Sequence, residues 1–258
     1  SSRRRHTRLR TVTGVQTCAL PICLNNQKQL ALAWMMYADD NNEKVVRFNT
    51  YGLDPSNWRT DTRYVLVTVP ASYSAEETVI YKVRMGYKQP SPMFEGPLFR
   101  YAPQPDIMHC PGDLRFKRPV GSGFAWDSYS GVNGLNGEGG SFMLKSTELK
   151  HPSERFLWAE GGDGRGENLG SWIMNQAGTA ATGFAGSTWI DSPAAFHGSS
   201  SSFNWADGHC SMRKWLNPAT VRYAQSMDQG KYGNSPSAAE VKDDAPWAAK
   251  GFATAINR

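Results

Sequence analysis

The sequence predicts a mixed α+β fold, on three observations. The run at 23–38 is rich in helix-forming residues, and two alternating polar and apolar runs within 202–213 flank an Asp-Gly pair, as the strands of a hairpin do. With 258 residues, 40% of them apolar and 20% charged, the chain can bury a core. Long loops are expected in three glycine-rich stretches, 119–141, 161–170 and 176–187.

The N-terminal helix is predicted over 23–38, because no glycine or proline interrupts its helix formers. Its apolar residues form one stripe at helical spacing, namely Cys23, Leu30, Trp34 and Tyr37. The Asp and Asn residues at 39–42 end the helix. They also resemble the start of a calcium loop, but Lys44 and Thr50 stand where such a loop has Gly and Glu. A solvated helix end is therefore the preferred interpretation.

The middle of the chain alternates short apolar runs with turn residues. A helix is expected at 76–88, where Val79, Val83 and Tyr87 are four residues apart. Strands are expected at 45–48 and 63–69, which are rich in Val and aromatic residues, and also at 107–110, 155–160 and 171–175. A short helix is expected at 96–101.

The hairpin at 202–213 turns at Asp207-Gly208. Asp-Gly favours a type I′ turn, which needs positive φ at both central residues. A C-terminal helix is expected to start at Asn217-Pro218, an N-cap followed by proline at the first helical position. Residues 229–258 contain few large apolar groups, so the part of 217–258 beyond this helix is predicted to be a loosely packed tail.

The excess positive charge lies entirely in the first 22 residues. The chain has 28 Lys and Arg against 23 Asp and Glu, a net charge of +5 and a pI of about 9.0. Residues 1–22 hold five arginines and no acid, so the other 236 residues are formally neutral. A basic arm or a transit peptide has such a composition, but SSRRRHTR and TGVQTCALPI resemble translated sequencing-adaptor DNA. We therefore interpret 1–22 as an artefactual tail in place of the natural N-terminus, and expect no nucleic-acid partner.

The strongest candidate for chemistry is a group of residues around the hairpin. His197, Asp207 and His209 offer two imidazoles and a carboxylate, which could bind a first-row metal. The preferred alternative is structural, with Asp207 serving the turn and the histidines bonding to the backbone. The serines at 199–202 near His197 suggest a nucleophile, but no G-x-S-x-G elbow is present. We expect no bound metal, no cofactor and no catalysis.

Three cysteines remain once Cys18 is assigned to the tail. Cys23, Cys110 and Cys210 lack C-x-x-C spacing, which argues against zinc and thioredoxin-like sites. A Cys23–Cys110 disulfide would pin the N-terminal helix to the sheet if the chain is exported. It requires Cα atoms within about 7 Å. Cys210 is expected to be a small core residue, and most of the nine tryptophans are expected to be partly buried.

Several separate blocks of the sequence resemble one family. The stretch from Cys23 to Asn41 has the pattern C-x-N-N-x-x-Q-L followed by Y-x-D-D-N, and the stretch from Gly96 to Asp113 looks like G-x-L-x-x-Y followed by C-P-x-D. The run 129–134 is similar to S-Y-G-x-N with one residue inserted, and 151–160 matches x-P-S-x followed by x-A-E. Finally, His197 and Asp207-Gly208 fit H-x9-D-G.

Together these blocks resemble the prepilin-type, processing-associated H-x9-D-G proteins, which are related to the G-type pseudopilins of type II secretion. The resemblance implies a pilin-like domain over 23–216, in which 23–42 is the distal half of an N-terminal helix packed on an antiparallel β-sheet. It makes His197, Asp207 and Gly208 structural motif residues. Family members begin with a basic leader, Phe-Thr-Leu-x-Glu and an apolar helix, in whose place this chain carries the adaptor-like tail.

The resemblance implies a non-catalytic, exported structural protein of a type II secretion or type IV pilus-like assembly. Its expected partners are other pilin-like subunits, the secretion or pilus machinery and, for the intact precursor, prepilin peptidase, with inner-membrane anchoring through the missing helix and a periplasmic or extracellular domain. One alternative is a surface-exposed module that binds a glycan or a protein, which an exposed Trp and Tyr cluster at 161–190 would favour. The other is a metal-dependent enzyme that uses His197, Asp207 and His209.

Overall fold

The structure is a computed structural model that describes residues 15–138, 143–228 and 234–254. Within these ranges the α-helices are α1 (Val15–Asp40), α2 (Ala75–Lys88), α3 (Pro218–Asp228) and α4 (Ala245–Gly251). The strands are β1 (Tyr129–Gly131), β2 (Phe156–Glu160), β3 (Met174–Asn175), β4 (Thr188–Trp189), β5 (Ser200–Trp205) and β6 (Cys210–Lys214). Four short 3-10 helices are η1 (Pro105–Met108), η2 (Arg115–Lys117), η3 (Ser146–Glu148) and η4 (Pro152–Glu154).

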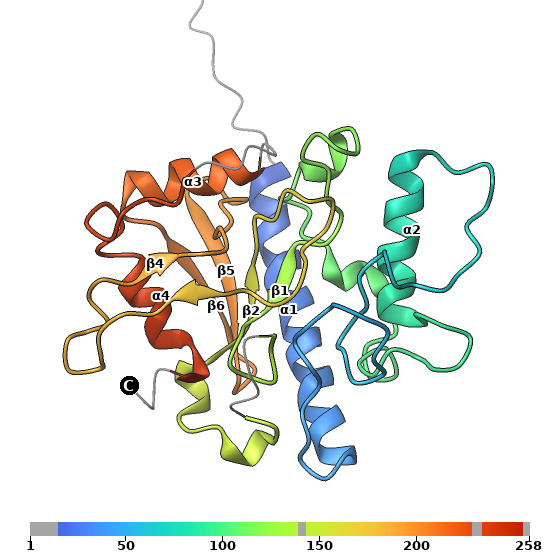
Figure 1. The fold of residues 1–258 in the computed structure, drawn as a ribbon, viewed down its shortest axis with the longest axis horizontal. Coiled ribbons are helices and arrows are strands. Elements are labelled where there is room, and N and C mark those ends of the chain that lie inside the picture. The colour runs from blue at the N-terminus through green and yellow to red at the C-terminus, as the bar shows by residue number, and fades with distance from the viewer. Residues whose placement is uncertain (1–14, 139–142, 229–233, 255–258) are drawn as a thin grey trace, which may run out of the picture.

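The predicted combination of helices with an antiparallel sheet is confirmed. Four strands pair antiparallel in the order β1-β2-β5-β6, and β3 and β4 form a separate two-stranded sheet. In Figure 1, α1 crosses the middle of the molecule, with the four-stranded sheet, α3 and α4 on one side and α2 on the other. Among the described residues, no helix has both the length and the apolarity needed to cross a membrane.

Helix α1 packs its apolar stripe against the rest of the protein, as predicted. Cys23, Leu30 and Trp34 are buried in a hydrophobic cluster, and Tyr37 packs against that cluster while partly exposed. The helix also contacts β5, where the Gln27 side-chain amide donates to the carbonyl of Ser202 over 3.3 Å. The helix begins at Val15, earlier than the predicted start, and it ends at Asp40, where the Asp and Asn residues predict an end.

Residues 241–254 are part of a second hydrophobic cluster, so the prediction of a loosely packed tail is wrong for them, whereas 234–240 are exposed or only partly buried. Val241, Ala245, Ala248, Ala249 and Phe252 are all buried there against β2, β5 and α3. Small residues make this possible because they let α4 approach the sheet closely. A Cβ at Gly251 would collide with the ring of Phe156. Residues 229–233 and 255–258 of the predicted tail lie outside the described residues.

The predicted hairpin is confirmed, but its turn differs from the type I′ prediction. The strands β5 and β6 pair from Ser200 with Lys214 to Asn204 with Cys210. The Gly208 amide donates to the Trp205 carbonyl over 2.9 Å, and only Gly208, not Asp207, has positive φ. A three-residue loop that ends on a left-handed glycine is the next most common hairpin connection, and it also suits an Asp-Gly pair.

Two other local predictions are confirmed. Helix α2 is confirmed, with Ser74 and Glu77 forming a capping box at its start, and β2 is confirmed over Phe156–Glu160. Of the predicted strand at 171–175, only Met174–Asn175 pairs with another strand.

Four other local predictions are wrong. Residues 45–48 form only one isolated bridge, at Arg47, and 63–69 form no strand, although Val45, Val46 and Phe48 are buried. The Val and Phe residues of 45–48 therefore reflect burial rather than strand pairing, whereas 63–69 is mostly exposed, with only Val65 buried. Residues 96–101 form turns instead of a helix. Of the predicted strand at 107–110, residues 107 and 108 belong to the 3-10 helix η1, and 109 and 110 follow it without forming a strand.

Candidate functional site

A disulfide joins α1 to the segment after η1. Cys23 and Cys110 are bonded, with their Cα atoms 5.0 Å apart, well inside the limit that the predicted pairing requires. Both residues are fully buried, and 87 positions separate them in the sequence. The bond therefore ties the N-terminal helix to the body of the domain. Cys210, half-buried on β6, is the free cysteine among the described residues.

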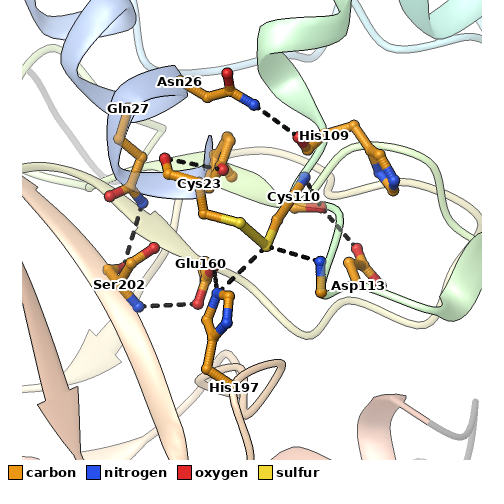
Figure 2. The surroundings of a disulfide bond; sticks show 12 residues. Cys23, Asn26, Gln27, His109, Cys110, Asp113, Glu160, His197 and Ser202 are labelled. Atoms are coloured by element: carbon orange, nitrogen blue, oxygen red, sulfur yellow. Dashed lines mark hydrogen bonds and ion pairs between the residues drawn. A yellow bond between two sulfur atoms is a disulfide. The ribbon is translucent and has the colours of Figure 1, made fainter. Parts of the chain in front are cut away.

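The signature histidine contacts this disulfide. His197 Nε2 lies 3.3 Å from Cys110 Sγ and 3.1 Å from Glu160 Oε1, and Figure 2 shows its ring pointing at both. The Glu160 side chain is fully buried and that of His197 is 7% exposed. Burial alone would lower the pKa of His197, but the hydrogen bond and the negative charge of Glu160 outweigh it and raise the pKa above its usual value. The histidine is therefore the natural counter-charge for the buried carboxylate.

Glu160 is the last residue of the otherwise apolar strand β2, which carries it into the interior. Its Oε2 accepts a 2.8 Å hydrogen bond from the Ser202 amide on the neighbouring strand β5, and the Ser201 hydroxyl lies 3.4 Å from the same oxygen. A buried carboxylate needs such partners, because leaving it unpaired costs free energy. Two residues of the serine run, Ser201 and Ser202, thus provide hydrogen-bond partners for Glu160.

The loop before β5 positions the imidazole of His197. A Cβ built at Gly112 would lie 3.0 Å from the ring carbon Cε1 of His197, so glycine at that position leaves the space the ring occupies. The preceding ring, Phe196, lies under the guanidinium of Arg115 at 4.9 Å. Residues of the C-P-x-D segment and its continuation therefore surround the histidine.

The backbone at Cys110 is held in place by a series of buried polar contacts. The Cys110 amide donates to Ser128 Oγ over 2.9 Å, and Ser128 Oγ donates to Asp113 over 2.8 Å. Asp113 pairs with Arg115 at 2.7 Å, and both side chains are fully buried. On the α1 side, the Tyr129 hydroxyl donates to the Cys23 carbonyl over 3.2 Å, and Asn26 donates to the carbonyl of His109 over 2.9 Å.

A second buried ionic group lies beside these contacts. Arg59 pairs with Asp127 at 2.7 Å and with Glu167 at 2.9 Å, and all three side chains are buried. Burial raises the pKa of Asp127 to about 6, with Arg59 opposing that effect. These charges stabilise one another in the interior, and sequence reasoning missed all three because none of them lies in a recognisable motif.

The predicted metal triad does not assemble. His197 precedes β5, whereas Asp207 and His209 follow it in the exposed turn, so the strand separates them by about 17–20 Å at roughly 3.3 Å per residue. Asp207 Oδ1 lies 2.6 Å from His209 Nδ1, and the His209 ring stacks on Trp205 with centroids 5.2 Å apart. The metal hypothesis for His197, Asp207 and His209 is therefore wrong, because its members occupy opposite ends of one strand.

A different set of side chains does offer metal ligands. The Sγ atoms of Cys23 and Cys110, a carboxylate oxygen of Glu160 and a ring nitrogen of His197 all lie within 4.8 Å of one another. The sulfurs are bonded to each other in this structure, so the group is a cross-link with two polar neighbours. Sequence reasoning quoted Glu160 only as part of a block. The signal that could have identified it is an acid closing a strand of apolar residues, Phe156–Ala159.

The residue blocks quoted from the sequence converge here in space. Five separate blocks each contribute one residue around the disulfide, namely Cys23, Cys110, Tyr129, Glu160 and His197. His197 contacts Cys110 and Glu160, and Tyr129 pairs with Glu160 and bonds to the Cys23 carbonyl. The Asp-Gly half of the last block is the exception, since it lies at the far end of β5. Comparison with protein-family models, with curated proteins and with solved structures finds no match to this chain.

The exposed Trp and Tyr cluster at 161–190 that would favour a binding module is not present, because both tryptophans of that range, Trp172 and Trp189, are buried. Six of the nine tryptophans are buried and the other three are partly buried, in agreement with the prediction that most are core residues. Partly exposed rings instead gather elsewhere. Trp205 and Trp247 line a cavity of about 450 Å³ together with Phe184, Arg155 and Lys250.

Proposed function

We propose that this protein is a pilin-like or pseudopilin-like exported structural subunit, with no catalytic role. The observation that carries the proposal is the helix α1 laid on an antiparallel sheet. Gln27 attaches the helix to β5, and Cys23 and Asn26 attach it to residues 109–110 after η1. A helix fastened this firmly can transmit load between an N-terminal anchor and the domain. Export would also supply the oxidising compartment in which a disulfide persists.

The contacts of the signature residues support a structural role. His197 and Glu160 hold the cross-link, and Gly208 closes the hairpin turn under α1, where a Cβ would lie 3.1 Å from Met35 Cε. None of these residues faces the cavity described above. His197 and Glu160 support the helix α1 at one end of β5, and Gly208 lies against it at the other end.

The exposed side of α1 supplies a surface for assembly. Leu32 and Met36 are one helical turn apart and are 46% and 50% exposed, although they are apolar. In a filament, such side chains would pack against the helices of neighbouring subunits. Within the natural protein this is the surface that we propose to contact other subunits.

Two experiments test this function. The uninterrupted gene upstream of the Cys23 codon should encode a basic leader, Phe-Thr-Leu-x-Glu and an apolar helix, and its absence would overturn the proposal. The second uses the full precursor in a Cys210→Ser background. A Met36→Cys variant should form intersubunit cross-links in cells that carry the assembly machinery, and Met93→Cys, at an exposed residue outside α1, should not. Equal cross-linking by both variants would contradict assembly through α1.

A glycan-binding module is a second candidate, favoured by the aromatic cavity. The rings of Trp205 and Trp247 and the charged groups of Arg155, Glu154 and Lys250 combine apolar faces with hydrogen-bonding partners, as sugar sites do. Titration with neutral oligosaccharides should then change the tryptophan fluorescence, and Trp247→Ala should abolish that change. An unaltered spectrum across cellulose and chitin fragments would remove this candidate.

A further inference from the structure

We propose that the disulfide cluster is a redox-dependent zinc site. In the reduced protein, the thiolates of Cys23 and Cys110, Nε2 of His197 and one carboxylate oxygen of Glu160 would bind a single Zn²⁺ tetrahedrally. The inference goes beyond the proposed structural role, which needs only the covalent bond.

The positions of the ligand atoms carry the inference. Zinc binds thiolate, imidazole and carboxylate at about 2.0–2.3 Å, which places the ligand atoms of a tetrahedral site roughly 3.3–3.8 Å apart. His197 Nε2 already lies 3.3 Å from Cys110 Sγ and 3.1 Å from Glu160 Oε1, and all four ligand atoms lie within 4.8 Å of one another. The two sulfurs must separate, while the other ligands need only small movements.

The surroundings orient these ligands from outside. The Ser202 amide holds the second oxygen of Glu160, which leaves the first directed at His197. The Gly112 amide donates to Cys110 Sγ over 3.3 Å, a bond that also suits a thiolate. Outer contacts of this kind fix ligand direction and raise metal affinity. Figure 2 shows Glu160 and His197 beside the disulfide, on two different segments of the chain.

The choice of zinc follows from the ligand set and from burial. Two thiolates with one imidazole and one carboxylate suit a borderline-soft ion with tetrahedral preference, whereas calcium and magnesium take oxygen ligands. Cys23, Cys110 and Glu160 are fully buried, so four protein ligands would fill the coordination sphere. Such a closed site is structural and leaves no position for a substrate.

The redox step balances with a dithiol as the reductant. The dithiol transfers two electrons and two protons to the protein disulfide, breaks the bond between the sulfurs and becomes a disulfide itself. The two protein thiols then bind Zn²⁺ as thiolates and release two protons. The cluster thus cross-links α1 to the body of the domain in both states, through a covalent bond when oxidised and through a metal ion when reduced.

The test uses the full chain with Cys18→Ser and Cys210→Ser, so that every thiolate signal comes from the proposed pair. The protein is reduced with a phosphine under anaerobic, non-denaturing conditions and titrated with Co²⁺, the spectroscopic substitute for Zn²⁺. One equivalent should produce both the thiolate charge-transfer band and the ligand-field bands of a tetrahedral ion. Zn²⁺ should displace them and raise the Tm of the reduced protein. The unreduced protein should show no such bands.

His197→Gln and Glu160→Gln each remove one ligand, and each should weaken Co²⁺ binding at least about 10-fold. Losing a contact that only orients a ligand already costs about 10-fold or more in metal affinity, so losing the ligand itself should cost no less. His209→Gln, a matched change of an exposed histidine, should leave the affinity unchanged. A reduced protein without tetrahedral bands, with bands of equal affinity in His197→Gln and His209→Gln, or with no rise in Tm on adding Zn²⁺, would overturn the proposal. The last two results are also those expected of a chain that unfolds on reduction and binds the metal through its cysteines alone, so the test detects that case.

Discussion

The two ends of strand β5 use histidine and acid in opposite ways. At one end, His197 and Glu160 are buried, lie 37 positions apart in the sequence and contact a disulfide between two further segments. At the other end, His209 and Asp207 are two positions apart and exposed, and they pair at 2.6 Å within a turn. The first pair joins four segments of the chain, and the second shapes one local loop. Burial and sequence separation, rather than residue type, distinguish a structural centre from a surface pair.

The largest expected effect is at the buried end, on removing the cross-link. Replacing both cysteines, Cys23→Ala with Cys110→Ala, should lower the free energy of unfolding by about 2–5 kcal/mol, because the disulfide restricts a long loop of the unfolded chain. Urea unfolding measures this loss. Cys210→Ala should change the stability by at most about 1 kcal/mol. A double variant as stable as Cys210→Ala would show that the bond contributes nothing to the fold.

The next effect compares the two histidines directly. His197→Ala should cost about 1–3 kcal/mol, because it leaves the buried Glu160 carboxylate with only its serine partners. His209→Ala should cost about 0–1 kcal/mol, because its pair with Asp207 is exposed. The same urea experiment measures both. Equal losses would remove the contrast between the two ends of β5.

At the turn, the expected cost lies in the backbone and not in the ion pair. Gly208 has a φ of 87°, so Gly208→Ala should destabilise the protein by about 1–2 kcal/mol, the usual penalty for a side chain in a left-handed conformation. Thermal unfolding should show a lower Tm for Gly208→Ala than for Asp207→Ala. The reverse order would mean that the acid, and not the glycine, determines the turn.

The pH dependence of stability should be the finest distinction. His197 has a raised pKa in the folded protein, so its interaction with Glu160 stabilises fully below the unfolded pKa of about 6.5 and is lost as pH rises through the folded pKa. The unfolding free energies of the wild type and of His197→Gln should therefore differ more at about pH 5 than at about pH 9. Burial lowers the pKa of His109, which has the opposite slope but cancels in this difference. A difference that grows with pH would contradict the charged pairing.

Sequence reasoning predicted the elements that local chemistry determines. The hairpin with its Asp-Gly turn and the capped helix α2 have partners within a few residues. The strand β2 and the apolar stripe of α1 were predicted from the spacing of their apolar residues, although they pack against distant segments. The cysteine pairing was also within reach, because few cysteines remained to pair. The same reasoning failed at 63–69, since a Val-rich run becomes a strand only when another strand lies beside it.

The candidate site was only partly predictable, for a physical reason. His197 was identified from its motif, but its expected partners were its sequence neighbours Asp207 and His209, and its actual partners are Glu160 and Cys110. Pairing across β2 and β5 brings Glu160 beside Ser202 and hence to the histidine, and spacing in the sequence does not reveal that register.

The position of α4 has a consequence for the order in which the protein folds. Ala245, Ala249 and Phe252 complete the cluster around Phe156 and Phe203, and all three follow the strands of the sheet in the sequence. The sheet face that they cover stays open to solvent until residues 245–252 have been synthesised, whereas Cys23 and Cys110 are both available well before that point. A premature stop before residue 241 would therefore release a chain that can form its cross-link but leaves a bare aromatic surface, the usual starting point for aggregation.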